Sequence, residues 1–173
     1  LSDTDTEVIP HLISQELARL LECGDLPSRA LLLEAVQKVV MTLEGTYAIA
    51  AIWSQTPDAL VVAKKQAPLV IGLGEGEFLC ASDMPALTGF TRTILPMEDE
   101  EVALVTPLGI ELYDIRGQRK NRNPLFLRGL DQVIDKRNFR HFMLKEIHEQ
   151  PETIQSWIAK HLSPDLPIET PVA

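Results

Sequence analysis

The sequence is poor in cysteine and in aromatic residues, and it has no long hydrophobic run. Its 173 residues include 2 cysteines, and aromatic side chains make up 5% of the total. Two cysteines are too few for a small scaffold held together by disulfides, and the core is expected to be mainly aliphatic. The most apolar runs, such as residues 48–53, are far shorter than the roughly 20 residues that cross a bilayer.

Positive charge is also scarce. The 16 Lys and Arg residues are outnumbered by 25 Asp and Glu, which gives a formal net charge of −9 and a pI near 4.9. A chain this acidic is a poor general binder of nucleic acid or of anionic membranes, so we expect neither as a partner. Apolar residues still make up 45% of the chain, enough for the core of one globular domain.

The two cysteines, Cys23 and Cys80, lie far apart, and neither has the spacing of a zinc site. A single disulfide is one alternative, but two buried thiols in a reducing compartment fit the composition better, which predicts a cytoplasmic protein. The sequence opens on Leu1 without the pattern of a signal peptide, and it closes on a proline-rich stretch, residues 163–173. We therefore expect a chain that has been cut at both ends.

Hydrophobic periodicity predicts two helices followed by a group of strands. Apolar residues recur at three- and four-residue steps over residues 5–22 and 29–44, as they do in amphipathic helices. Helices followed by short strands with tight turns indicate a layered α+β domain with a largely antiparallel sheet. Strands that are apolar at nearly every position, such as residues 47–53, are expected to be covered on both faces. The seven expected strands are residues 46–54, 59–64, 68–73, 77–81, 91–95, 102–106 and 109–115.

The rest of the chain divides into a basic stretch and a further helix. Residues 116–140 contain eight Lys and Arg against two Asp, so they are either a nucleic-acid patch or a solvated connector that docks on the acidic domain or on an anionic ligand. We favour the connector, because no aromatic residues are interleaved with the charges. Residues 141–161 are expected to be helical and divided at Pro151. The predicted organisation is a domain over 1–115, a basic connector over 116–140 and a helical segment over 141–173.

No complete catalytic centre is visible in the residue patterns. Gly72, Gly74 and Gly76 suggest a phosphate loop, but no helix pattern follows them, and a glycine-rich hairpin turn is the better interpretation. Ser82-Asp83 fits ordinary turn chemistry. The four histidines (His11, His141, His148 and His161) lack metal-binding spacing, so no metal site is predicted.

Candidate nucleophiles and substrate ligands are also few. Cys23 has no basic neighbour, and Cys80 lies in an apolar strand where a thiol is inert. Asp5 heads the first predicted helix. Its carboxylate can interact with the helix dipole or bind a substrate ammonium group, and spacing alone favours the dipole.

Three stretches resemble the glutamine–fructose-6-phosphate aminotransferase (isomerizing) family, whose members are also called glucosamine-6-phosphate synthases. They are residues 2–9 (SDTDTEVI), residues 68–83 (PLVIGLGEGE leading to ASD) and residues 140–151 (RHFMLKEIHEQP). The resemblance extends over about residues 2–155 and covers the second half of the family's glutaminase domain and the start of its interdomain linker. The chain departs from the pattern at Pro10, at His148 and over residues 163–173.

The resemblance implies an αββα sandwich of the N-terminal-nucleophile (Ntn) hydrolase, or class-II glutamine amidotransferase, type, incomplete in this chain. In that family an N-terminal cysteine hydrolyses the side-chain amide of L-glutamine, with its own α-amine as the base. The ammonia passes to a second domain, which converts fructose 6-phosphate into glucosamine 6-phosphate. No cofactor or metal is implied, and the complete parent is expected to be a homodimer.

The resemblance also assigns one site residue. Asp5 matches the aspartate that binds the α-ammonium group of glutamine, which reverses the preference drawn from spacing alone. The nucleophile, the arginine for the substrate carboxylate and the Asn-Gly of the oxyanion hole are all expected before Leu1, and the sugar-phosphate site is expected after Ala173. No catalytic residue is therefore expected in the chain itself, which should be inactive alone. The alternatives are a fragment of another class-II glutamine amidotransferase and a non-catalytic interaction domain.

Overall fold

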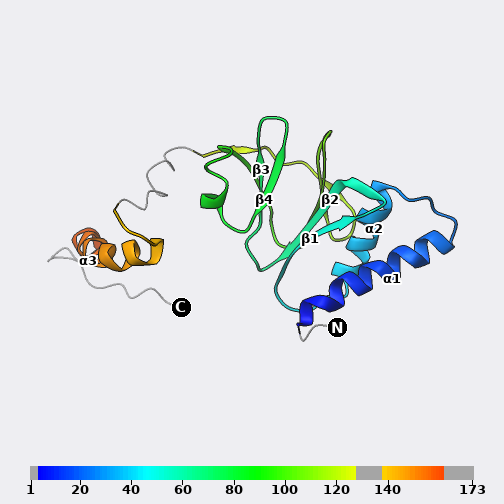
Figure 1. Ribbon diagram of the computed structural model, residues 1–173, viewed down its shortest axis with the longest axis horizontal. Coiled ribbons are helices and arrows are strands. Elements are labelled where there is room, and N and C mark those ends of the chain that lie inside the picture. The colour runs from blue at the N-terminus through cyan, green and yellow to red at the C-terminus, as the bar shows by residue number, and fades with distance from the viewer. Residues whose placement is uncertain (1–3, 128–137, 162–173) are drawn as a thin grey trace. The chain divides into compact units, whose positions relative to one another are not determined.

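The computed structural model describes residues 4–127 and 138–161. The chain divides into two units, Leu1–Leu130 and Asp131–Ala173, and each is described by itself (Figure 1). The first unit contains both sheets and the first two α-helices, and the second contains one helix. None of the helices in the described ranges combines the length and the hydrophobicity needed to span a bilayer.

Two helices form the first layer of the larger unit. A 3₁₀ turn, η1 (Asp5–Glu7), leads into α1 (Val8–Glu22). Pro10 is the third residue of α1, in the first turn, where its missing N–H removes no bond within the helix. The helix predicted over residues 5–22 is confirmed, with this 3₁₀ start.

The second helix, α2 (Arg29–Val40), begins at a side-chain cap. Ser28 is extended, and its Oγ accepts a hydrogen bond from the Leu31 N–H at 3.1 Å. The helix ends at Val40, earlier than the predicted residue 44. Gly45, with a φ of +91°, lies in the connection to the first strand rather than next to the helix end.

Nine strands in the described residues form two antiparallel sheets. The seven predicted strands are present, and two short strands in the basic stretch, β8 and β9, were not predicted. The five-stranded sheet has the order β1-β2-β6-β7-β8, and the four-stranded sheet has the order β4-β3-β5-β9. Their bounds are β1 Tyr47–Trp53, β2 Thr56–Lys65, β3 Val70–Leu73, β4 Phe78–Ala81, β5 Thr93–Pro96, β6 Glu101–Thr106, β7 Gly109–Asp114, β8 Arg119–Lys120 and β9 Leu125–Phe126.

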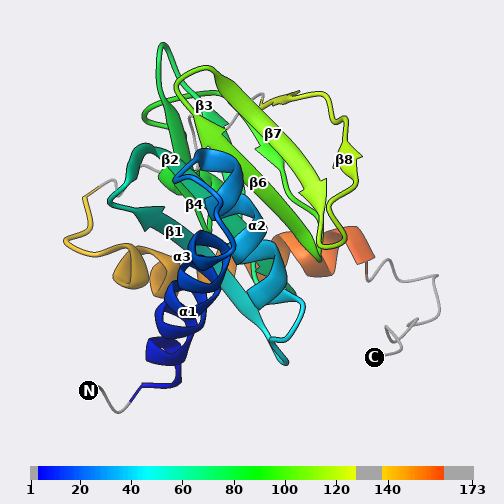
Figure 2. The same cartoon turned by 90° about the vertical axis from the view of Figure 1, so that its right-hand side faces the viewer.

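The two sheets and the helices stack as layers. Figure 2 shows α1 and α2 lying against the five-stranded sheet. Because successive side chains of a strand point to opposite faces, Val61 of β2 packs against the helices while Val62 packs against the second sheet. On β6, Val102 and Ala103 divide in the same way. The layers α, β and β of the expected sandwich are therefore present, and the predicted layered α+β fold with antiparallel sheets is confirmed.

The outer face of the four-stranded sheet has a small core of its own. Val70 and Ile94 point outward there and pack with the buried Leu87, which follows the 3₁₀ turn η2 (Met84–Ala86). Within residues 4–127, no α-helix covers this face. The second helical layer of a complete αββα sandwich is therefore not found in this part of the chain.

One strand does not fit the sequence-based prediction. Residues 47–53 were expected to be covered on both faces, but in β1 every second residue is exposed: Ala48, Ala50 and Ile52. The prediction was wrong for this strand because burial of a strand depends on its neighbours in space, and β1 lies at the end of its sheet.

The second unit contains α3 (Phe142–His161), which runs through Pro151 without a break. The predicted division at Pro151 is wrong; an interior proline removes one backbone hydrogen bond, and here the helix continues through it. Large apolar side chains of this helix, including Ile147, Ile154 and Trp157, are exposed. Lys145 is the buried residue of this helix.

The space between the two sheets should contribute strongly to the stability of the larger unit. Ile71 of β3 is fully buried there, whereas Ile52 of β1 is 70% exposed. We expect Ile71→Ala to lower the free energy of unfolding by about 2–5 kcal/mol, because it removes buried methyl groups and leaves a cavity. Urea denaturation measures this loss, and Ile52→Ala is the matched control, expected to change it by under about 0.5 kcal/mol. Equal losses in the two variants would contradict this core.

Candidate functional site

An apolar groove lies between the start of α1 and β1. Its volume is about 740 Å³, and its wall includes every residue of β1. Val8, Ile9 and Ile13 contribute the aliphatic side from α1, and Leu43 lies beyond the end of α2. The polar residues of the wall are few: Thr6, Ser14, Glu44, Thr46 and Tyr47. A surface with this composition suits a largely apolar occupant with a few polar groups.

Asp5, the predicted substrate ligand, is the first residue of η1. It directly precedes Thr6, which lines the groove, so the backbone of Asp5 lies next to a residue of the groove wall. The position of its carboxylate lies outside what the structure describes. Its role as the ligand of an ammonium group therefore stays a prediction.

The glycine-rich stretch forms a hairpin turn, as predicted. It joins β3 to β4, and the Gly74 N–H donates a hydrogen bond to the Glu77 carbonyl at 2.9 Å. Gly76 has a φ of +77°, which favours glycine. A Cβ at Gly72 would lie 2.8 Å from Cγ2 of Thr91, so a side chain there would force the packing apart. These glycines have a structural explanation.

The other polar candidates also have local structural roles. Asp83 precedes η2, and its carbonyl accepts a hydrogen bond from the Ala86 N–H at 3.3 Å, which is ordinary turn chemistry. His11 lies 3.5 Å from Glu7 on α1, His148 stacks on Phe139 and His161 stacks on Trp157. Among the residues that the structure describes, no group of three or more His, Cys, Asp or Glu could hold a metal ion.

The cysteines differ in environment. Both are free thiols. Burial raises the pKa of the Cys80 thiol to about 11, which confirms the inert thiol predicted for this strand. Cys23 is exposed at the end of α1, so the prediction of two buried thiols was wrong for this residue. The error arose because the apolar run of α1 ends at Leu21, and the helix turns Cys23 outward beyond it.

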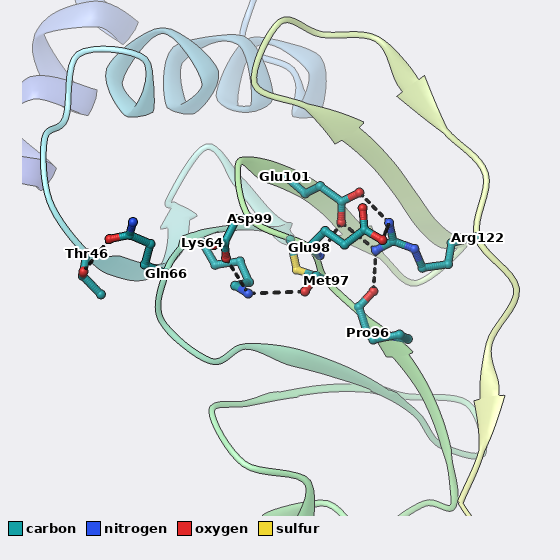
Figure 3. A network of polar contacts seen from close by, with 9 residues as sticks. All are labelled: Thr46, Lys64, Gln66, Pro96, Met97, Glu98, Asp99, Glu101 and Arg122. Atoms are coloured by element: carbon teal, nitrogen blue, oxygen red, sulfur yellow. Dashed lines mark hydrogen bonds and ion pairs between the residues drawn. The ribbon is translucent and has the colours of Figure 1, made fainter. Parts of the chain in front are cut away.

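A partly buried ion pair in the larger unit joins the two sheets. Arg122 lies between β8 and β9, and its guanidinium pairs with the buried Glu101 of β6 through Nη1–Oε2 and Nη2–Oε1 distances of 2.7 and 2.8 Å (Figure 3). Nη1 also donates to the Pro96 carbonyl of β5 at 2.8 Å. Burial is the largest single influence and lowers the pKa of Arg122, but the hydrogen bonds and charges of Glu101 and Glu98 together outweigh it and raise the pKa above its ordinary value. The Arg122 guanidinium thus binds residues of both sheets.

A second contact lies beside it. Lys64 of β2 pairs with Asp99 at 2.8 Å and donates to the Met97 carbonyl at 3.4 Å (Figure 3). The Asp99 carboxylate has a pKa below its usual range, because it accepts hydrogen bonds from Lys64 and from the Gln66 backbone. Together with Arg122, this pair fixes the connection between β5 and β6, residues 97–100.

Sequence reasoning missed the pairing of Glu101 with Arg122. The strand was predicted to begin at residue 102, and Arg122 was counted among the charges of the basic stretch. The sequence did contain one signal of this pairing. Glu101 directly precedes the apolar run of residues 102–105, and an acidic side chain that is buried with such a run needs a partner. The partner itself could not be found from spacing, because it follows only from the fold.

The comparisons with known proteins agree with this fold. No family model matches the chain. It is 46% identical over 170 residues to the glutamine–fructose-6-phosphate aminotransferase (isomerizing) of Thermosynechococcus vestitus, which covers 98% of this chain and 26% of that protein. Proteins of the same name from Nostoc and Synechocystis are each 48% identical over 90% and 94% of the chain. The chain therefore spans about a quarter of the length of these curated relatives.

Among solved structures, the chain is similar to the glutamine phosphoribosylpyrophosphate amidotransferase of B. subtilis, solved with ADP and GMP. The TM-score is 0.53 at 24% identity, over 66% of this chain and 23% of the other. At this identity the likeness concerns the fold alone, and it agrees with the layered α+β architecture described above.

The buried ion pair of Arg122 gives a prediction about stability. Arg122→Ala leaves the carboxylate of Glu101, 5% exposed, without its guanidinium. We expect a loss of about 3–5 kcal/mol in the free energy of unfolding, because an unpaired buried charge is costly. The control is Arg29→Ala, whose partner Asp58 is 47% exposed, with an expected loss below about 1 kcal/mol. Chemical denaturation at neutral pH compares the two variants. Adding Glu101→Gln to Arg122→Ala should recover part of the loss.

The thiols give a prediction about pH. With a pKa of about 11, the Cys80 thiol is almost wholly protonated at pH 8. We therefore expect iodoacetamide to alkylate it slowly at that pH, and the alkylation rate to increase roughly tenfold for each unit by which the pH is raised toward the pKa. The exposed Cys23 should react first. Peptide mass spectrometry of the folded chain resolves the two sites, and Cys80→Ser controls for their assignment. Equal alkylation rates at pH 8 would contradict the burial of Cys80.

Proposed function

We propose that this chain, which is homologous to a quarter of the length of glutamine–fructose-6-phosphate aminotransferases, is a fragment of such an enzyme and forms part of its glutamine-hydrolysing domain. The observation that carries the proposal is the 46% identity over 98% of the chain to a protein of that name. The fold shared with a second glutamine-dependent amidotransferase supports the same assignment. The complete parent converts L-glutamine and fructose 6-phosphate into L-glutamate and glucosamine 6-phosphate.

In this proposal the chain supplies part of the framework of the glutaminase domain and one residue, Asp5, that binds the substrate. Residues 1–115 belong to the glutaminase domain, residues 116–140 connect it, and residues 141–173 lead into the second domain. The parent is a cytoplasmic homodimer that uses no cofactor. The two free thiols are in keeping with a reducing compartment. The nucleophile and the fructose 6-phosphate site belong to parts of the parent that this chain does not include.

The role proposed for Asp5 follows from its position as well as from the resemblance. It begins η1, and the next residue lines the apolar groove beside β1. A carboxylate beside a groove can pair with an ammonium group, while the apolar part of the wall accommodates a short aliphatic stem. L-glutamine carries both features. We therefore propose that Asp5 binds the α-ammonium group of glutamine.

A second candidate is a different glutamine amidotransferase with the same fold. The observation in its favour is the structural likeness to the phosphoribosylpyrophosphate amidotransferase, but the sequence identity there is 24%, against 46–48% for the aminotransferases. Sequence therefore favours the aminotransferase, and the acceptor of the ammonia distinguishes the two. The complete parent should form glucosamine 6-phosphate from fructose 6-phosphate and should not aminate phosphoribosylpyrophosphate.

The experiment that tests the site is Asp5→Asn in the complete parent enzyme. Removing the charge beside a substrate ammonium group should cost about 1.5–3 kcal/mol, which corresponds to a fall of roughly 10- to 150-fold in kcat/KM for glutamine. Glutamate release measures it. Asp25→Asn, which removes an exposed carboxylate in the turn after α1, is the matched control and should leave kcat/KM unchanged. An unchanged kcat/KM in the Asp5 variant, with glucosamine 6-phosphate still formed, would remove Asp5 from the site but leave the enzyme assignment intact.

A further inference from the structure

Within residues 4–127 the chain passes from one sheet to the other three times, always at the same end of the strands. These connections are residues 66–69 between β2 and β3, 97–100 between β5 and β6, and 121–124 between β8 and β9. The first two run side by side. Lys64 is opposite Glu101 in the five-stranded sheet, and Val70 is opposite Pro96 in the four-stranded sheet. Arg122 of the third connection contacts both Glu101 and Pro96.

Opposite charges hold these connections together. Lys64 pairs with Asp99 at 2.8 Å, and Lys65 pairs with Glu100 at 3.0 Å. The Glu100 N–H donates a hydrogen bond to the Lys64 carbonyl at 3.0 Å. Figure 3 shows Lys64, Asp99 and the Arg122 guanidinium within one group of polar contacts. The carboxylates of Asp99 and Glu100 are 50% and 49% exposed, so dissolved ions can screen both pairs.

Each of the first two connections also contains a left-handed residue that is not glycine. Gln66 has a φ of +57°, and Glu100 has a φ of +62°. This conformation is uncommon for a residue with a side chain and persists where the surroundings impose it. Here the Asp99 carboxylate accepts a hydrogen bond from the Gln66 backbone, and Lys65 holds the Glu100 side chain. A few residues at the ends of elements are where a hinge takes up its change in backbone angles.

The core between the sheets is less completely buried at the opposite end of the strands. In the middle of the strands, Val62 and Ile71 are fully buried. Two residues further from the connections, Leu60 and Leu73 pack against the same core but are only partly buried, as is Phe78. The hairpin turns at this far end, β1–β2, β3–β4 and β6–β7, each join strands of one sheet. Within residues 4–127, the covalent links between the sheets therefore all lie at the other end.

We propose that the three connections form a hinge, held shut by the pairs Lys64–Asp99 and Lys65–Glu100, about which the two sheets separate while each keeps its own backbone hydrogen bonds. The core between the sheets consists of apolar side chains, so separation breaks packing contacts and leaves the ladders of both sheets intact. The two ion pairs limit the movement because they fasten the connection 97–100 to the end of β2. The inference goes beyond the proposed function and does not depend on it.

Cys80 is a natural reporter of this movement. It is opposite Ile71 in the β3–β4 pair, and its side chain packs against the core between the sheets. The thiol is therefore shielded while the sheets are closed, and their separation exposes it to a reagent. Cys23 is exposed at the end of α1, away from the sheets' common core, and serves as an internal reference for the reagent.

The test compares two double variants of the full 173-residue chain. Asp99→Asn with Glu100→Gln removes both charges that hold the hinge. Glu34→Gln with Asp58→Asn is the matched control, because these carboxylates are 49% and 47% exposed and pair with cations of α2. Alkylation by iodoacetamide at pH 8 is followed by peptide mass spectrometry.

The loss of two partly exposed ion pairs should raise the Cys80 alkylation rate about 3- to 10-fold in the hinge variant. The control variant should change this rate by less than about twofold. The rate at Cys23 should be the same in the hinge variant as in the unmodified chain, because Cys23 lies outside the space between the sheets.

Salt tests the same ion pairs without a substitution. Raising the ionic strength from about 0.1 M to about 1 M shortens the screening length from about 10 Å to about 3 Å. Alkylation of Cys80 in the unmodified chain should then become about threefold faster or more, whereas the hinge variant should respond little. Hydrogen exchange under the same conditions separates a hinge from unfolding, because the backbone amides of β2 and β3 should stay protected.

Three results would overturn the inference. The first is an equal Cys80 rate in the two double variants. The second is a Cys80 rate in the unmodified chain that does not respond to salt, and this comparison decides the matter if the hinge variant does not fold. The third is loss of amide protection in β2 and β3 in step with alkylation, which identifies unfolding as the source of the exposure. Glutamine takes no part in these measurements, so this proposal and that for Asp5 can fail separately.

Discussion

The layers of the larger unit depend on the pair of strands β2 and β6, which bury side chains on both of their faces. Val61 and Val102 fill the layer under the helices, while Val62 and Ala103 fill the layer between the sheets. The stretches of β2 and β6 that are covered on both faces, residues 59–63 and 102–105, are apolar, and each strand is paired on both edges. The helices, the second sheet and the groove beside β1 take their positions from these two strands.

Charge reinforces this arrangement where the sheets approach each other. Glu101 is at the start of β6, and Arg122 brings the segment after β8 back across to the Pro96 carbonyl of β5. The guanidinium suits this role because its planar set of donors pairs with both carboxylate oxygens and still reaches a third acceptor. The basic stretch therefore contributes to the larger unit through at least this cation, while its residues 128–137 lie outside the described structure.

Much of the fold could be predicted from the sequence, because its signals are local. The periodicity of α1 and the glycine-rich hairpin each depend on a few neighbouring residues. The failures have non-local causes. Burial of β1 depends on which strand lies next to it, the pairing of Arg122 depends on the fold, and Pro151 is tolerated inside α3. The candidate site was predicted less well: Asp5 came from a resemblance, and the groove could not be inferred before α1 and β1 were placed together.

The order of the strands along the chain has a further consequence. Along the chain, β1 and β2 belong to the five-stranded sheet, and β3 to β5 belong to the four-stranded sheet. The next strands, β6 to β8, belong to the five-stranded sheet again, and β9 belongs to the four-stranded sheet. Because the two sheets are interleaved in this way, a cut at any loop between β2 and β9 separates strands that belong together. The larger unit cannot be divided there into two halves that each keep a whole sheet. A split-protein design or a circular permutation that opens the chain between residues 66 and 124 would have to rejoin strands across the break, whereas an opening before β1 leaves every described strand pair on one piece.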